Sequence, residues 1–328
     1  LQIIPAIRMK IIFTSTLLLL LTLQLFSQTL NLPPRQQNAL TGSEFAQLVW
    51  DLSLTDRENE IFSQVMSGNI PDFQRNLIPV NFSSTISGQV YNVTYFVSPD
   101  YLAIGNDTNY FLIPMTPLLA QKICNQTNTT MPTRKMVDQI WSKATVKLAP
   151  STIPPSPQMT TIPVMYQHNQ TVWNQRKNVI ATNPLGELVG GTKKDVVISN
   201  RIYGYPPPGR VVIYGWHYLS GTAIQPLYNG HGESYADYSH GIRLVQDSIL
   251  INGEPSKITT ILQSETLHTL FSDEGRIQIP HYPSGTSSIF PPNAWGVLTE
   301  NENSLRLIVH NNPEVSHYKV HLSGDGKI

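Results

Sequence analysis

Paired cysteines and charged side chains are the two features that this chain has least of. Cys124 is the only cysteine among 328 residues, so no disulfide can form within the chain, and we expect Cys124 to be a buried apolar residue rather than a nucleophile. Charged residues make up 13% of the sequence, about half the usual share, and the formal net charge is zero. Because the basic residues are scattered, a nucleic-acid partner is not expected.

An apolar run near the N-terminus indicates export. From Met9 the sequence has one positive residue, Lys10, then apolar residues at 11–26 and small or polar side chains after them, as in a secretory signal peptide. The run is too short, and too closely followed by two prolines, for a comfortable membrane span. We expect residues 1–27 to be upstream sequence and signal peptide. The protein is then secreted or periplasmic, with no membrane span after cleavage, and the lack of disulfides favours a bacterial source.

The pattern of apolar residues predicts an α+β fold with two domains. Residues 38–148 mix helical and alternating patterns, which predicts a small domain of helices and an antiparallel sheet. Residues 149–163 contain five prolines among Ser and Thr, so we expect an extended linker there. Residues 164–300 are rich in strand patterns and predict a β-rich antiparallel domain that carries the function.

The individual elements follow from the same periodicity. We expect helices at 42–53, 54–68, 116–127, 132–144, 164–177 and 254–272, with Ser43, Thr55 and Thr116 as N-caps of the first three. Strands are expected at 77–86, 89–99, 101–105, 193–199, 210–218, 223–228, 235–245 and 248–253.

The C-terminal end has a pattern of its own. Residues 301–328 alternate like two strands and stop at a turn-like Gly-Asp-Gly. This stretch resembles the opening strands of a fibronectin type III-like module. The resemblance implies that the chain is a fragment of a longer, modular secreted protein.

Titratable side chains are concentrated in residues 228–245, whose sequence is YNGHGESYADYSHGIRLV. In a strand at 235–245, Asp237, Ser239 and Arg243 would share one face and could bind a polar substrate. Tyr238 and His240 would lie on the other face, where burial would keep the imidazole neutral. We predict a substrate-binding role for Ser239, Arg243, Tyr238 and His217.

Two catalytic mechanisms fit these residues. In the first, three His (His217, His231 and His240), or His231 and His240 with Asp237, bind zinc and activate a water molecule. In the second, a His with Asp237 acts as the base for Ser239. Either way His231, His240 and Asp237 are the predicted catalytic residues, although no His-X-His and no Gly-X-Ser-X-Gly is present.

The stretch SHGIRLVQD at 239–247 resembles the signature of L,D-transpeptidases, which reads Ser-His-Gly-Cys-Ile/Val-Arg-Leu. His240 and Arg243 match the His and Arg of that signature, and the catalytic Cys is missing because Gly241 is followed directly by Ile242. The resemblance implies a protein near peptidoglycan. Without a thiolate, it does not imply an active transpeptidase.

These observations leave three hypotheses open. The first is a secreted hydrolase, with or without zinc, that acts on a cell-wall or other extracellular polymer: peptidoglycan, glycan or peptide. The second is a non-catalytic extracellular protein for glycan or peptide binding or adhesion. The third is a catalytically dead relative of L,D-transpeptidases.

Overall fold

The computed structural model describes residues 28–203, 209–283, 296–301 and 304–309. The chain divides into two compact units, residues 1–282 and residues 283–328. The second unit contains one described antiparallel hairpin, β15 (Gly296–Asn301) and β16 (Ser304–Val309). The predicted signal peptide and residues 310–328 lie outside the described residues, and the fibronectin-like resemblance remains a prediction.

Five helices of the larger unit lie where helical periodicity predicts them. They are α2 (Gly42–Leu48), α3 (Leu54–Met66), α4 (Pro117–Thr127), α5 (Arg134–Lys143) and α6 (Ile162–Val179). Thr116 caps α4 as expected. The N-caps of α2 and α3 are Thr41 and Ser53 rather than Ser43 and Thr55, and each hydroxyl accepts a hydrogen bond from the backbone N–H three residues further on.

The larger sheet joins the two regions that were expected to be separate domains. Its strand order is β14-β13-β2-β12-β5, with β1 also paired to β2. The strands are β1 (Ile78–Ile86), β2 (Gln89–Val97), β5 (Thr129–Thr130), β12 (Val245–Gln246), β13 (Ser248–Ile251) and β14 (Glu254–Lys257). Because β2 and β5 pair with β12, residues from both sides of the predicted linker share one sheet and one hydrophobic core. The α+β class is confirmed, and the described residues 28–282 belong to a single compact unit.

A second sheet places the chemically interesting residues. Its order is β10-β9-β8-β11, with β8 (Lys194–Val196), β9 (Arg210–His217), β10 (Ala223–Gly232) and β11 (His240–Gly241). β9 pairs antiparallel with both β10 and β8, whereas β11 pairs parallel with β8 through His240 opposite Lys194. Residues 193–195 therefore lie beside the polar segment around His240.

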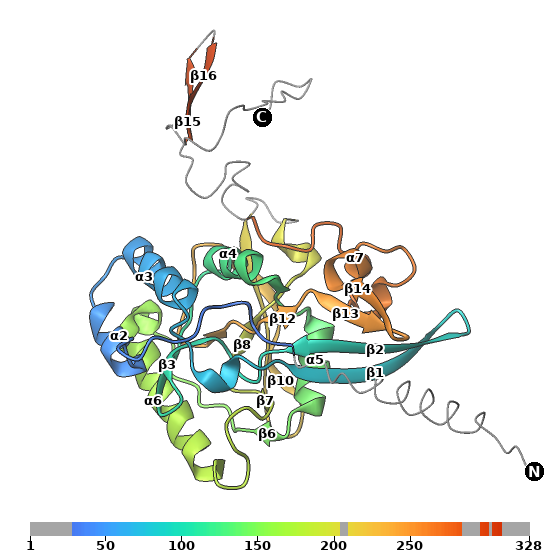
Figure 1. Ribbon diagram of the computed structural model, residues 1–328, viewed down its shortest axis with the longest axis horizontal. Helices are drawn as coiled ribbons and strands as arrows, with labels where there is room; N and C mark the ends of the chain where they lie inside the picture. The colour runs from blue at the N-terminus through green and yellow to red at the C-terminus, as the bar shows by residue number, and fades with distance from the viewer. Residues whose placement is uncertain (1–27, 204–208, 284–295, 302–303, 310–328) are drawn as a thin grey trace, which may run out of the picture. The chain divides into compact units, whose positions relative to one another are not determined.

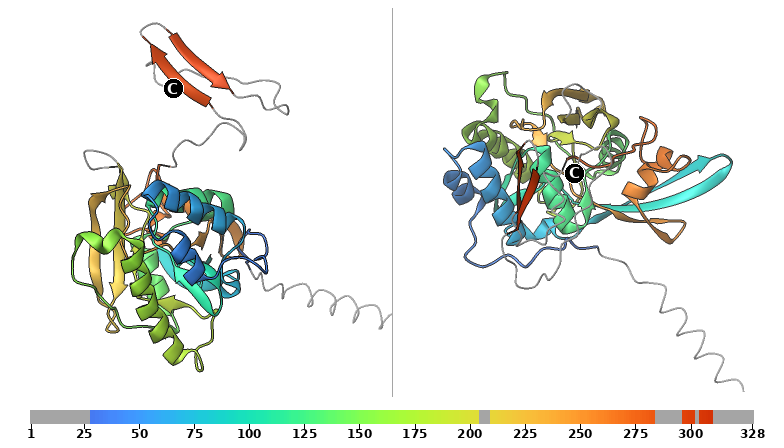
Figure 2. Two further views of the ribbon diagram at one scale, coloured as in Figure 1. Left: turned by 90° about the vertical axis from the view of Figure 1, so that its left-hand side faces the viewer. Right: turned by 90° about the horizontal axis from the view of Figure 1, so that it is seen from above.

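Shorter elements complete the unit. They are β3 (Ala103–Asn106), β4 (Asn109–Leu112), β6 (Val146–Lys147), β7 (Val189–Gly190), η2 (Asp72–Gln74), η3 (Pro157–Thr160), η4 (Asn200–Ile202), η5 (His268–Leu270) and α7 (Ile258–Leu262). In Figures 1 and 2 the β1–β2 hairpin extends away from the body of the unit, and α2, α3 and α6 lie at the opposite side. None of the described helices has the length and apolar character needed to cross a membrane.

The Pro-rich segment 149–163 packs into the unit instead of linking two domains. Ile153 both donates its N–H to the Tyr238 hydroxyl, at 2.8 Å, and accepts a hydrogen bond from it through its carbonyl, at 3.1 Å. The backbone N–H of Tyr238 donates to the Met159 carbonyl. Because proline has no backbone N–H, this segment has few donors of its own. It is held mainly by the Tyr238 hydroxyl and by hydrogen bonds that its carbonyl groups accept.

The expected helix at 254–272 is wrong over most of its length. Asn252 and Gly253 both have positive φ, of 52° and 87°, and form the two-residue loop between β13 and β14. Asn-Gly is the favoured sequence for such a tight hairpin turn. The turn sends residues 254–257 back along the sheet, and only the five residues of α7 form an α-helix after it.

The packing of α2 against the β3–β4 hairpin generates a prediction about stability. A Cβ added at Gly42 would lie 2.5 Å from the backbone carbonyl carbon of Tyr110. Gly42→Ala should therefore lower the free energy of unfolding by about 1–3 kcal/mol, although alanine is the better helix former. Urea unfolding measures the change. Gly232→Ala is the matched control, because a Cβ there meets no atom within 4 Å, and equal stabilities for the two variants would contradict the packing described.

Candidate functional site

The segment 235–245 is not the continuous strand that its alternation predicts. Within it, only β11 and the first residue of β12 pair with other strands. Residues 236–245 are all buried, so neither of the two expected faces is exposed to solvent. The reason is a local turn. Asp237 accepts hydrogen bonds from the backbone N–H and the hydroxyl of Ser239, at 2.8 and 2.5 Å, which is the side-chain-to-backbone pattern that competes with strand pairing.

Arg243, expected to bind substrate, is instead a buried structural cation. Its side chain is 1% exposed and donates to the carbonyls of Ser98, Pro99 and Val189 at 2.8–3.3 Å. Its Nε lies 3.7 Å from Asp195 Oδ1, and its guanidinium lies over the ring of Tyr101 at 4.3 Å. Burial raises the pKa of the Asp195 carboxyl to about 6, although Arg243 and the Tyr101 hydroxyl act in the opposite direction.

The other predicted catalytic residues gather around one aromatic side chain, Tyr235. The Tyr235 hydroxyl donates to Asp237 Oδ2 at 3.1 Å. The ring of His231 stacks on Tyr235 at 4.0 Å between centroids, and His240 meets the same ring edge-on at 5.7 Å. The sequence correctly indicates that His231, Asp237 and His240 lie near one another.

The geometry of this cluster does not match either expected mechanism. Ser239 donates its hydroxyl to Asp237, and neither ring nitrogen of the fully buried His240 has a hydrogen-bond partner among the described residues. Burial lowers the pKa of His240 to about 4 and also lowers that of His231. Burial alone would raise the pKa of Asp237, but His240 and the hydrogen bonds from Ser239 outweigh it and hold the pKa below its usual value.

The expected zinc site is not formed. Across the described parts of the chain, no group of three or more His, Cys, Asp or Glu side chains could hold a metal ion. His231 and His240 each pack against the ring of Tyr235, and Asp237 accepts the hydrogen bond from the Tyr235 hydroxyl. Three converging ligands are the minimum for a catalytic zinc, and these three residues do not form such a set in the described structure.

His217 belongs to a different neighbourhood. Its Nε2 lies 2.9 Å from Oδ1 of Asp138 on α5, and Tyr214 donates its hydroxyl to the same carboxylate. Trp141 stacks on the His217 ring at 5.4 Å. Trp216, the preceding residue, has a φ of 55°, an uncommon value for a bulky residue. Trp216 and His217 are both buried.

Lys193 is a buried titratable residue that the sequence does not reveal. Its side chain is 0% exposed, its Nζ donates to the Tyr238 carbonyl at 2.7 Å, and it lies 3.5 Å from His168 Nδ1. Burial lowers the pKa of Lys193 to about 7 and that of His168 to about 3. The sequence GGTKKDV reads as an exposed turn entering a strand, because no local pattern distinguishes a buried lysine from a surface one.

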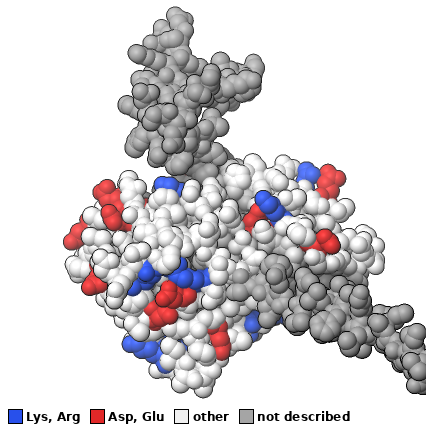
Figure 3. Space-filling view, viewed as in Figure 1, with Lys and Arg blue, Asp and Glu red and all other residues white. Residues whose placement is uncertain are grey.

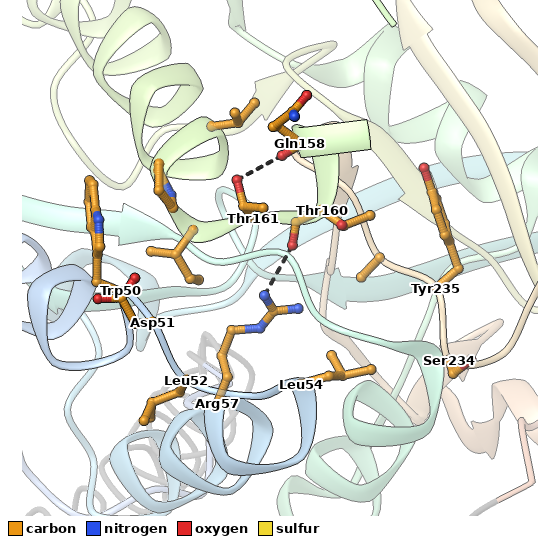
Figure 4. Close-up of a pocket in the computed structure, with 14 residues that line it drawn as sticks. Trp50, Asp51, Leu52, Leu54, Arg57, Gln158, Thr160, Thr161, Ser234 and Tyr235 are labelled. Carbon is orange, nitrogen blue, oxygen red and sulfur yellow. Dashed lines mark hydrogen bonds between the residues drawn. The ribbon is translucent and has the colours of Figure 1, made fainter. Parts of the chain in front are cut away.

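A pocket of about 780 Å³ lies next to the polar segment and contacts it through Tyr235 and Ala236. Three stretches of chain line it: residues 50–57, residues 158–164 and residues 234–236. Figure 4 shows Trp50 and Tyr235 at opposite sides, with Arg57 reaching from α3 toward Thr160 between them. The pocket lining includes aromatic, hydroxyl, amide and guanidinium groups, and it is the described surface where a ligand could best reach the polar segment.

The sequence alone does not reveal this pocket. Trp50 and Arg57 fall in expected helices, and Thr160 falls in the expected linker, so their patterns suggest packing or connection. Only long-range folding brings them together with Tyr235. Comparison with known proteins adds no relative, because no family model, no curated protein and no solved structure matches the chain. The resemblance to L,D-transpeptidases therefore stays a prediction.

Lys193 makes the stability of the protein depend on pH. Its pKa is about 7 in the folded protein against an ordinary value of 10.5, so between these values the unfolded chain holds a proton that the folded protein lacks. The free energy of unfolding should therefore increase with pH from about 7 to about 10, and Lys193→Met should remove up to about 1.4 kcal/mol per pH unit of that increase.

Urea unfolding at pH 7.5, 8.5 and 9.5 measures the slope. Lys194→Met is the matched control, since this side chain is only half-buried and its variant should keep the wild-type slope. An unchanged slope in Lys193→Met would show that the lysine is protonated throughout this range.

Proposed function

We propose that this chain is a secreted protein that binds an extracellular polymer, a glycan or a peptide of the cell-wall kind, in the pocket between Trp50 and Tyr235. One observation carries the proposal. The side chains of Asp237, Ser239 and Arg243 are buried and make their hydrogen bonds within the protein, whereas the adjoining pocket presents aromatic and polar groups to solvent. Aromatic rings beside polar groups are typical of sites that bind amphipathic ligands.

The dimensions of the pocket fit part of a polymer. A volume of about 780 Å³ lies within the usual range for ligand sites, about 300–1,000 Å³. That is room for a few sugar units or amino acids. The two sides of the pocket come from segments far apart in sequence but held in one compact unit, so the site is formed before the ligand arrives and little ordering is needed on binding.

An aromatic strip leads away from the pocket along β10. We define it by Tyr228, His231 and Tyr235, whose rings contact in order at 5.6 and 4.0 Å between centroids. Tyr228, at the far end, is 42% exposed. A continuous series of rings suits a chain-like ligand that extends beyond the pocket, since each ring can contact a successive unit.

The distribution of charge supports a polymer other than nucleic acid. On the face shown in Figure 3, basic and acidic side chains are interspersed and no extended basic patch appears. Nucleic-acid binding depends on concentrated positive charge that displaces counterions from phosphates. The proposed ligand is therefore recognised mainly through rings and hydrogen bonds.

A hydrolytic role is the second candidate, and one contact favours it. The Tyr235 hydroxyl, which borders the pocket, donates to Asp237 within the buried cluster. Burial, with help from Asp237, raises the pKa of Tyr235 to about 12, so the hydroxyl keeps its proton at neutral pH. In a hydrolase this hydroxyl, at the pocket wall, would be the candidate proton donor.

Loss of either aromatic wall should weaken binding of the polymer. Trp50→Ala and Tyr235→Ala should each reduce retention on insoluble peptidoglycan, chitin or collagen at least tenfold, because central aromatic residues dominate such contacts. Co-sedimentation measures retention, and thermal unfolding confirms that each variant is folded. Tyr218→Ala, an exposed tyrosine outside the pocket, is the matched control. Wild-type retention by both pocket variants on every polymer would reject the proposed site.

Tyr235→Phe separates the two candidate functions, because it keeps the ring and removes the hydroxyl. For a binding protein we expect near-normal retention and no release of soluble fragments from any polymer, in wild type or variant. Fragment release is followed through new reducing ends and new amino groups. Release by the wild type that falls at least a hundredfold in Tyr235→Phe, without loss of retention, would instead establish the hydrolytic role.

A further inference from the structure

Among the described residues that line the pocket, Arg57 is the only cationic one, and it forms no ion pair with any of the others. Its side chain is 6% exposed, and it lies at the end of the first turn of α3. One terminal nitrogen, Nη1, donates to the Thr160 carbonyl at 3.1 Å. The buried Nε has no hydrogen-bond partner, and Nη2 forms no hydrogen bond with any described residue.

The buried guanidinium of Arg57 lacks the ion-pair partner and the full set of hydrogen-bond acceptors that a buried charge normally has. Buried cations in proteins are usually paired and have their donors satisfied, because an unpaired charge away from water is costly. Arg243 is better supplied: its Nε also lacks a hydrogen bond, but its terminal nitrogens have three carbonyl acceptors and Asp195 lies 3.7 Å from the Nε. Arg57 has a single carbonyl acceptor, and burial lowers its pKa.

The neighbouring carboxylates do not supply the missing partner. Glu58, the next residue, attracts the Arg57 charge but forms no ion pair with it. Its two oxygens accept hydrogen bonds from the backbone N–H and the hydroxyl of Thr116, at 2.7 and 2.9 Å, at the start of α4. Asp51 also lines the pocket but is exposed, and it forms no ion pair with Arg57. Figure 4 shows the guanidinium of Arg57 directed into the space between Thr160 and Leu54.

We propose that the ligand of this pocket carries a carboxylate, which Arg57 binds through its unpartnered donors, and that the ligand is an acidic glycan. This inference rests on the proposed function and names its ligand class. A carboxylate matches the planar donor pattern of a guanidinium better than any neutral group. The remaining lining suits a sugar, since the rings of Trp50 and Tyr235 can contact pyranose faces while Thr and Gln side chains bond to hydroxyl groups.

The test compares two disaccharides that differ in one carboxylate. The acidic probe is N-acetylglucosaminyl-N-acetylmuramic acid, and the neutral probe is diacetylchitobiose, which has the same sugar rings without the lactyl group. Isothermal titration with the 328-residue chain should give at least tenfold tighter binding of the acidic probe. That preference should weaken as the salt concentration increases.

Two substitutions identify the residue responsible. Arg57→Gln should bring the affinity for the acidic probe down to that for the neutral one and leave the neutral affinity within about twofold. Arg57→Lys, which keeps the charge but loses the planar arrangement of donors, should retain an intermediate preference. Arg276→Gln, which removes an exposed guanidinium outside the pocket lining, is the matched control and should preserve discrimination. Binding of the neutral probe also verifies that each variant is folded.

The possible outcomes are distinct. Equal affinity of the wild type for the two probes, or equal loss of both in Arg57→Gln, overturns the acidic-glycan inference and leaves the proposed binding function standing. Retention on collagen without retention on either polysaccharide would assign the pocket to peptide and overturn the inference as well. Failure to bind either probe or any polymer rejects both the inference and the proposed function.

Discussion

The region around the candidate site depends on one buried cation, Arg243. Its guanidinium joins the end of β2, through the Ser98 and Pro99 carbonyls, to β7, through the Val189 carbonyl, and it lies close to Asp195 on β8. Removing one partner of a buried charge typically costs about 3–5 kcal/mol, so these segments are constrained to meet at Arg243. The residue that resembles the Arg of a transpeptidase signature is therefore the structural centre of the region.

The wall of the pocket owes its position to that buried centre. Ala236 and Tyr235 border the pocket, and the next residues turn inward through the bonds between Asp237 and Ser239. Tyr238 then ties this turn to the Pro-rich segment at Ile153. A ligand consequently meets a surface that is already ordered on both sides, and binding energy is not spent on arranging it.

Periodicity in the sequence predicts most of the elements and none of their long-range arrangement. The helices at 117–127 and 134–143 and the hairpin of β1 and β2 follow from apolar spacing and capping residues. The polar segment was misread because its alternation suggests a strand, although an Asp followed two residues later by Ser also fits a turn in which the carboxylate accepts the backbone N–H. The burial of Lys193, and the position of Arg57 without an ion-pair partner among the described residues, arise only when distant segments fold together, so the sequence does not show them.

The same limit applies to the candidate site. Grouping His231, Asp237 and His240 was correct, because they are close in sequence and their segment folds back on Tyr235. The role assigned to them was not supported, since reactivity depends on exposure and hydrogen-bond direction, which residue types do not encode. Trp50 and Thr160, which face the pocket, come from segments separated by more than a hundred residues and share no local motif with Tyr235.

The central claim is that ligand binds in the pocket beside Trp50, while the buried cluster of His168, Lys193 and Tyr238, which packs against Trp216, is structural. The ¹⁵N-labelled indole groups of the two tryptophans report on these places separately, once each signal is assigned with a Trp→Phe variant. On titration with the acidic disaccharide, the account predicts a saturable shift of the Trp50 indole signal and an unchanged Trp216 signal. A shift confined to Trp216 would place the ligand in the buried cluster around Tyr238 and contradict the account.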